Sequence, residues 1–270
     1  MPVRALRLLW VAVMLAAVGV APGCAKKSGV VPTGILEADK YLYDRGNELV
    51  AKKKWFQARE YFRQLVDNYP QSNYRPDAKL GLGDSFLGED SAESLVLAEN
   101  EYREFLTFYP THARADYAQF KLGMCHYAQM QAADRDQTET REAIVELTNF
   151  VQRYPNSTIM GEGRQKLRDA RDRLSESDFK VGYFYFRSKW YPGAIDRFKG
   201  VLKDDPEYTG RDAVYFYLGE SLVKMGRRAE AVPYYDRLIK EFEKSQYLLK
   251  AQQSMAAAIA GQAPAPPVKK

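Results

Sequence analysis

Residues that could hold a metal ion are scarce in this chain of 270 residues, which contains two histidines and two cysteines. Neither His112 nor His126 is spaced with cysteine, aspartate or another histidine as zinc ligands are, so no metal site is expected. The chain also lacks a glycine-rich phosphate loop and a G-x-S-x-G nucleophile motif. These absences favour a protein that is not an enzyme and needs no cofactor.

Paired carboxylates are the remaining candidates for catalysis. The pairs Asp134/Asp136 and Asp204/Asp205 fall in segments that predict turns or polar insertions, where solvated charge is the simpler interpretation. The net charge is +5, and no basic block with interleaved aromatic residues occurs. A balance this weak gives no reason to expect a nucleic-acid partner.

A long hydrophobic run is absent as well, although the N-terminus is apolar. Residues 1–23 combine a basic start with the 13-residue stretch "LLWVAVMLAAVGV". As a helix it would rise about 20 Å, which is too short for a bilayer core of about 30 Å. It is typical of a secretory signal peptide. The stretch ends in "APGC" and so resembles a bacterial lipobox, which predicts that Cys24 is lipidated and becomes the new N-terminus; ordinary cleavage nearby is the alternative.

Residues 24–34 follow as a flexible tether, "CAKKSGVVPTG". Several acyl chains on Cys24 would hold a soluble body firmly at a membrane, because each buried methylene contributes about 0.8 kcal/mol. Ala25 follows the cysteine in place of the aspartate associated with inner-membrane retention, which favours the outer membrane by analogy. With Cys24 acylated, Cys125 has no intrachain partner, so we expect a small buried side chain and no disulfide scaffold.

An internal repeat dominates the rest of the sequence. A proline follows an alanine by 12 residues at Ala58, Ala98, Ala143 and Ala194, and a fifth alanine, Ala231, keeps the pattern without the proline. Large residues recur four and seven positions after each alanine, which places all three on one helix face. A glycine precedes each alanine and is tolerated where another helix packs closely. The markers are Gly46, Gly83, Gly123, Gly182 and Gly219.

This is the tetratricopeptide pattern of paired helices, which predicts an all-α solenoid over residues 35–260. The five expected units are 39–72, 76–112, 116–157, 175–208 and 212–245. A polar insertion is expected at 131–142, and a long connecting helix before the fourth unit. A helix at about 246–259 would cap the open end. Residues 261–270 are predicted to be disordered.

The first helix of each pair lines the concave side of such a solenoid, so its exposed positions are candidates for binding a partner. The expected inner face is an aromatic groove with few charges, suited to an extended peptide or an amphipathic helix. Packing against the neighbouring helix is the alternative for each of these residues, which are Lys40, Tyr43, Asn47, Leu80, Asp84, Tyr117, Phe120, Met124 and Tyr127.

The lipoprotein signal, the tether, the five repeats and the "YPxS" repeat ends together resemble the BamD/YfiO family of outer-membrane lipoproteins. The segments "KKWFQAREYFRQLVDNYPQS" and "RDRLSESDFKVGYFYFRSKWYPGAIDRFKGVLKDDPEYTG" carry the likeness locally, and it covers about residues 35–260. The "DDPEY" segment and the degenerate fifth unit depart from the family pattern.

The resemblance implies a lipid-anchored scaffold that faces the periplasm from the outer membrane of a Gram-negative bacterium. Its implied partners are the periplasmic domains of the β-barrel assembly subunit, other assembly lipoproteins and segments of unfolded outer-membrane proteins. Arg197, in "AIDRF", matches a family position on the docking side, although a solvated arginine is the alternative. A pilotin-like lipoprotein and a cell-envelope adaptor with a coiled coil are other possibilities; no heptad segment precedes the repeats, which counts against the adaptor.

Overall fold

The computed structural model describes residue 31 and residues 36–261. The predicted signal peptide, the lipidated Cys24, most of the tether and almost all of the predicted tail lie outside these described residues. Within them the chain forms eleven α-helices and no strand, which confirms the predicted fold class. The helices are α2 (Ala38–Ala51), α3 (Trp55–Asn68), α4 (Arg75–Glu89), α5 (Ala92–Phe108), α6 (Ala115–Gln129), α7 (Thr138–Arg153), α8 (Met160–Arg187), α9 (Tyr191–Asp204), α10 (Arg211–Lys224), α11 (Arg228–Glu241) and α12 (Leu248–Ala260).

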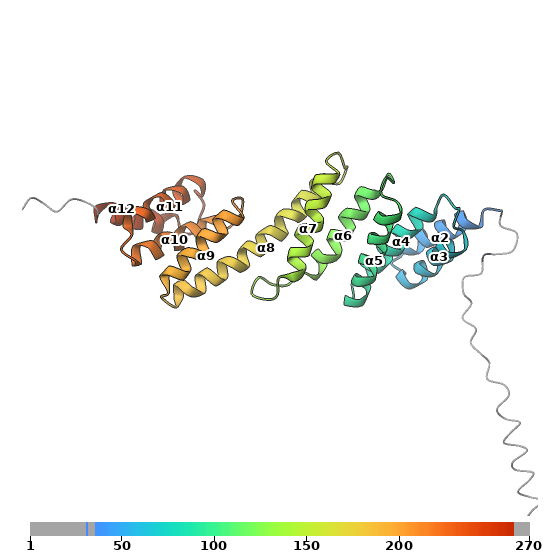
Figure 1. The fold of residues 1–270 in the computed structure, drawn as a ribbon, viewed down its shortest axis with the longest axis horizontal. Coiled ribbons are helices and arrows are strands. Elements are labelled where there is room, and N and C mark those ends of the chain that lie inside the picture. The colour runs from blue at the N-terminus through green and yellow to red at the C-terminus, as the bar shows by residue number, and fades with distance from the viewer. Residues whose placement is uncertain (1–30, 32–35, 262–270) are drawn as a thin grey trace, which may run out of the picture.

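The helices stack in one elongated row in which each packs mainly on its neighbours in the sequence (Figure 1). This is the arrangement of a tetratricopeptide-repeat solenoid. Helix α8 has 28 residues, about 42 Å at 1.5 Å per residue, and crosses the middle of the row. Its N-terminal half packs on α7, and its C-terminal half pairs with α9. Helix α12 covers α11 at the C-terminal end.

Each helix pair is held by the residues that the repeat pattern marks. The five marker alanines are fully buried, and so are the large residues four positions later. A Cβ added to Gly46 would lie 2.5 Å from Cε1 of Phe62, so only glycine allows the ring to reach this backbone. Four other pairs repeat this contact, namely Gly83–Tyr102, Gly123–Leu147, Gly182–Phe198 and Gly219–Tyr235.

Two further glycines make the same close contact with an aromatic ring, but between adjacent pairs, which the pattern did not predict. Gly81 of α4 also packs against the ring of Phe62, and Gly163 of α8 packs against Phe150. Phe62 is therefore enclosed by glycines of two successive first helices. The same large side chain thus sets the spacing within its own pair and to the next pair.

In three of the five pairs the turn after the second helix adds a second contact through a serine. At the first turn the N–H of Ser72 donates to the carbonyl of Tyr69 at 3.0 Å, and Pro70 has the fixed φ that favours such a turn. The Ser72 hydroxyl donates to Asp39 at the start of α2, 2.6 Å away. Ser157–Asp116 and Ser245–Asp212 repeat this bond at the same distance. The fifth pair therefore keeps the serine contact although it lacks the proline.

Two expectations about polar segments are wrong in detail. Helix α7 already begins at Thr138, so the insertion is shorter than 131–142, because Asp136 accepts the N–H of Thr138 and favours a helix start there. Asp205 is not solvated: it is 8% exposed and takes the place of the tyrosine in the fourth turn. It accepts hydrogen bonds from Arg168 (3.0 Å from Nη1) and from Ser175 (2.8 Å), both on α8.

Replacing Gly46 with alanine should lower the free energy of unfolding. The new methyl group would overlap the Phe62 ring, and overpacking of about 1–3 kcal/mol outweighs a gain in helix propensity of about 1 kcal/mol. Urea denaturation measures the difference. Gly200→Ala is the matched control, because nothing lies within 4 Å of its added Cβ, and this variant should be stabilised; equal effects of the two changes would contradict the packing role.

Asp205→Ala should cost about 1–3 kcal/mol at neutral pH, because it leaves the buried Ser175 hydroxyl without its acceptor and removes one of the carboxylates that pair with Arg168; the other close one is Asp172, 3.0 Å away. Burial alone would raise the pKa of Asp205, but the hydrogen bonds from Arg168 and Ser175 lower it overall. Its contribution is therefore complete above the unfolded pKa of about 3.9 and is lost as the pH falls below it. Denaturation across pH should show the variant and wild type converging in acid, whereas exposed Asp204→Ala should change little at any pH.

Candidate partner-binding surface

Helix α2 presents two of the predicted residues to solvent. Lys40 and Asn47 are exposed on α2, where Lys40 pairs with Asp44 at 3.5 Å and the Asn47 amide donates to the carbonyl of Tyr43. Tyr43 is half-buried, and its ring stacks on Tyr74 with the centroids 5.2 Å apart. These residues form the end of the predicted face, with Tyr43 fixed by the next helix pair.

Asp84 is engaged inside the molecule. It accepts hydrogen bonds from the hydroxyls of Tyr102 at 2.7 Å and Tyr117 at 2.8 Å, so it joins α4, α5 and α6. Burial, followed by the charge of Asp84, raises the pKa of Tyr117 above its ordinary value, so both phenols remain donors at neutral pH. Both hydrogen bonds end on Oδ1, so Asp84 positions the Tyr117 ring through one of its two carboxylate oxygens.

A row of half-buried side chains follows along α6, made of Tyr117, Met124 and Tyr127. Cationic groups lie over both tyrosine rings, which the sequence did not indicate. The Arg114 guanidinium lies 4.6 Å from the Tyr117 ring centre, and the ammonium of Lys166 on α8 lies 4.6 Å from that of Tyr127. Lys121 also approaches Tyr117, at 5.4 Å. The expectation of an aromatic surface with few charges is therefore wrong: this tyrosine–cation row is both aromatic and basic.

Two of the residues expected on the exposed face are core residues. Leu80 is fully buried, and Phe120 is only 3% exposed, with its ring 5.5 Å from that of Phe150. Leu80 packs in a cluster that joins α4, α5 and α6, and Phe120 packs in a cluster with α7 of its own pair and with α8, so neither side chain can line a groove. Phe120 is removed from the candidate surface for this reason.

Arg197 lies far along the row, exposed on α9. It lines a shallow hollow with Asp178, Asp196 and Asp204. No described carboxylate comes within ion-pair distance of its guanidinium. Burial raises the pKa of Asp178, although Arg141 and Arg197 act in the opposite direction. The Arg197 guanidinium is therefore free to pair with an acidic group from outside.

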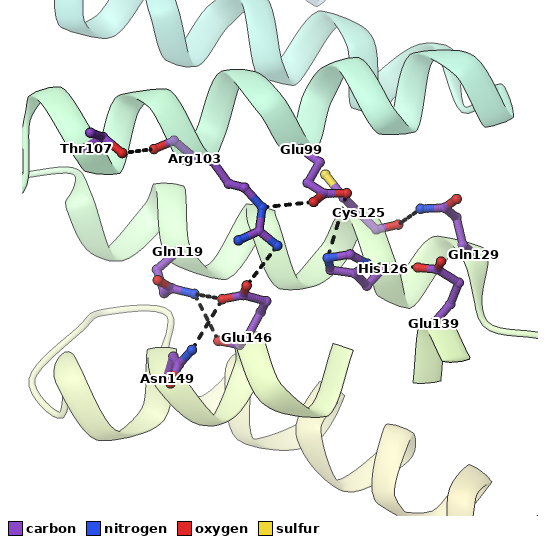
Figure 2. Close-up of polar contacts among 10 residues, drawn as sticks. All are labelled: Glu99, Arg103, Thr107, Gln119, Cys125, His126, Gln129, Glu139, Glu146 and Asn149. Carbon is purple, nitrogen blue, oxygen red and sulfur yellow. Dashed lines mark hydrogen bonds and ion pairs between the residues drawn. The ribbon is translucent and has the colours of Figure 1, made fainter. Parts of the chain in front are cut away.

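A polar network joins the second and third helix pairs (Figure 2). Exposed Arg103 of α5 pairs with Glu99 at 2.8 Å and with buried Glu146 of α7 at 3.1 Å. Glu146 also accepts a hydrogen bond from the Gln119 amide of α6 at 2.8 Å. The network thus ties α5, α6 and α7 together.

His126 is also buried, as its inward repeat position predicts. Its Nδ1 lies 2.8 Å from Glu139 and its Nε2 3.9 Å from Glu99. Neighbouring Cys125 is fully buried, which confirms the expectation of a small core side chain. Burial, followed by the charge of Glu99, raises the pKa of the Cys125 thiol to about 12, so this thiol stays protonated and unreactive at neutral pH.

Among the described residues, no group of three or more His, Cys, Asp and Glu side chains is arranged to hold a metal ion. Within the same part of the chain, no helix is sufficiently long and apolar to span a bilayer.

Asp84→Ala should destabilise the protein by about 1–3 kcal/mol, because it leaves the fully buried Tyr102 hydroxyl without its acceptor. Asp84→Asn keeps an oxygen acceptor and should retain most of the stability. Thermal and urea denaturation of both variants measure this difference. If the alanine variant were as stable as wild type, Asp84 would be free for a partner rather than occupied by the two tyrosines.

Comparison with known proteins agrees with the resemblance. The model of the YfiO family, described as an outer membrane lipoprotein, matches residues 37–234. Outer membrane protein assembly factor BamD of Caulobacter vibrioides is 30% identical over 224 residues, which cover 82% of this chain and 72% of the relative. The protein of the same name from Vibrio cholerae is 26% identical over 195 residues, covering 68% and 78%.

Among solved structures, the TPR2AB domain of yeast Sti1 in complex with an HSP90 peptide gives a TM-score of 0.44 at 12% identity, covering 83% of both chains. A tetratricopeptide-repeat protein of Thermus thermophilus gives 0.36 at 17% identity, covering 82% of this chain and 99% of that one. Likenesses of this size say nothing about function. The family model and the curated relatives are sufficient: the chain belongs to the YfiO family of outer-membrane lipoproteins, whose curated relatives are named outer membrane protein assembly factor BamD.

Proposed function

We propose that this protein is a non-catalytic scaffold of the outer-membrane protein assembly machinery, anchored by lipidated Cys24 and facing the periplasm. The observation that carries the proposal is the tyrosine–cation row of α6 and α8, because half-buried tyrosine rings and basic side chains lie together along one solenoid. Segments of unfolded outer-membrane proteins are its proposed ligands. Family membership supplies the biological setting.

The row suits a peptide with aromatic side chains and a terminal carboxylate. Aromatic side chains of a ligand can pack on Tyr117 and Tyr127, and Met124 between them adapts to different shapes. Lys121 and Lys166 supply positive charge for the carboxylate, while the carboxyl group of Asp169 lies 3.3 Å from the Tyr127 hydroxyl and fixes that ring. Such a surface binds without chemistry and tolerates many sequences, as a receptor for numerous unfolded substrates requires.

A second contact would join the scaffold to the barrel-forming subunit. Arg197 is the proposed docking residue, because its guanidinium is exposed and has no ion-pair partner among the described residues. It would pair with an acidic residue on the periplasmic domains of that subunit. Binding substrate and inserter on one chain raises their effective concentration, and other assembly lipoproteins would use the remaining surface.

Tyr127→Ala combined with Lys166→Ala should weaken binding of a fluorescent peptide from the C-terminus of an outer-membrane β-barrel protein. Loss of one aromatic face and its cation, about 0.5–2 kcal/mol, corresponds to roughly a 2- to 30-fold rise in Kd. Fluorescence anisotropy measures it, with the exposed Val145→Ala of α7 as the matched control. Equal affinity of the double variant and the control would contradict the proposal.

The cellular arm of this test uses depletion and complementation. Depletion should lower many outer-membrane β-barrel proteins together, and Arg197→Glu should fail to restore them although the protein still folds. Normal β-barrel levels with failed pilus assembly or secretion would instead support a pilotin-like role.

A further inference from the structure

One face of α8 continues past the helix that covers it. The positions Gly163, Leu167, Ala170 and Leu174 recur every three or four residues and face α7; a Cβ on Gly163 would meet the Phe150 ring, and Leu167 packs in the same cluster. The same spacing continues through Ser177, Val181 and Phe184. Since α7 begins only at Thr138, no helix lies against this second half of the stripe among the described residues.

The uncovered half of the stripe is apolar and exposed, since Phe184 is 64% exposed and Val181 36%. Trp190, which directly precedes α9, adds a third large apolar side chain that is 55% exposed. The Trp190 ring stands edge-on to Tyr185 with the centroids 4.6 Å apart, which fixes both rings. We call Val181, Phe184, Tyr185 and Trp190 the α8 patch.

The segment between α6 and α7 forms the opposite wall of a hollow beside this patch. Arg173 donates to the carbonyl of Gln131 at 2.9 Å, and Lys180 lies 3.9 Å from Asp134, so both ends of the wall are attached to α8. Ala133 and Arg135 line the hollow together with Ser177, Val181 and Phe184. The patch therefore borders a shallow, open hollow between α8 and the α6–α7 segment.

The rim of the hollow carries a small net positive charge. Arg135 lines the hollow, and Arg187 follows Phe184 by about one helical turn. Both arginines are exposed, and neither side chain has an ion-pair or hydrogen-bond partner among the described residues. Lys180 pairs with Glu176 and Asp134, but its single charge balances only one of these two carboxylates, so the three cations and two carboxylates leave a net charge of +1. An occupant with acidic side chains would match this rim.

We propose that the α8 patch docks a short amphipathic helix of a partner protein, with an apolar stripe against Phe184 and acidic residues toward Arg135 and Arg187. Helix α7 already packs on the first half of the same stripe. The stripe residues recur every three or four positions along α8, a spacing that allows the side chains of a second helix to pack between them. This surface is separate from the tyrosine–cation row and from Arg197, so the inference does not depend on the function proposed for them.

Other occupants fit the charge pattern less well. A second copy packed symmetrically through this patch would place one basic rim against another. Residues 25–34 and 262–270 of this chain contain no Asp or Glu, so neither segment complements the rim. The charge pattern therefore favours an acidic helix from a different protein.

Site-specific photocrosslinking in living cells tests the proposal on the full, processed chain. A benzoylphenylalanine placed at Val181 or Phe184 should form an adduct that mass spectrometry maps to one acidic, amphipathic segment of another protein. The matched control is the same label at Phe108, which is 67% exposed on α5 and should not give this adduct. The mapped segment, made as a peptide, should gain helicity on binding the purified protein, as measured by circular dichroism.

The affinity of that peptide gives the second readout. Phe184→Asp should weaken binding at least tenfold, and so should exchange of the acidic residues of the peptide for lysine, whereas Phe108→Asp should leave it unchanged. Three results would overturn the proposal: no adduct at either position, an adduct mapped to this same chain, or binding that Phe184→Asp and Phe108→Asp affect equally. Because none of these variants touches the tyrosine–cation row, binding of β-barrel peptides should persist in all of them.

Discussion

The structure depends on one contact, the seating of a large side chain of each second helix against the glycine backbone of its first helix. Phe62 on Gly46 and Tyr235 on Gly219 are the two ends of this series. The contact brings two helix axes closer than any residue with a Cβ would permit, and a fully buried alanine allows the same approach from the other side. Gly81 and Gly163 repeat the contact between successive pairs, at the α3–α4 and α7–α8 junctions, so the spacing at these two junctions follows from it as well.

Polar groups then fix the orientation of helices, both within a pair and between pairs. Ser72 attaches the first turn to Asp39, Asp84 holds two tyrosines of the next helices, and the Arg103–Glu146 pair links α5 to α7. Each of these bonds crosses between helices rather than running along one. Helix α8 belongs to both arms of the solenoid, since α7 packs on its first half and α9 on its second (Figure 1). The tyrosine–cation row and Arg197 are therefore carried on opposite arms that α8 holds in one geometry.

Local repetition explains why so much of the fold could be predicted from the sequence. The glycine, alanine and large-residue markers lie within one helix pair, so a fixed spacing was enough to place them, and the long helix was visible as the excess length before the fourth pair. Several of the contacts that were missed join residues distant in sequence. Lys166 reaches Tyr127 from another helix, and Arg168 pairs with Asp205 across a helix pair. The cations beside Tyr117 are different, because Arg114 and Lys121 lie within one helical turn of it, and helical spacing could have placed them there. Phe120 packs on Phe150 of the same repeat, so its burial could also have been predicted.

Helix α8 holds the two arms of the solenoid in one fixed arrangement. Electron–electron double resonance can measure this arrangement in a chain with Cys24→Ser and Cys125→Ala. The two spin labels are attached to cysteines that replace exposed Asp44 of α2 and exposed Arg237 of α11. We expect a single narrow distance distribution between the labels, because glycines of α8 pack on both arms: Gly163 contacts Phe150 of α7, and Gly182 contacts Phe198 of α9. A broad or two-peaked distribution would contradict it, since the arms would then move independently and could not present their surfaces in one geometry.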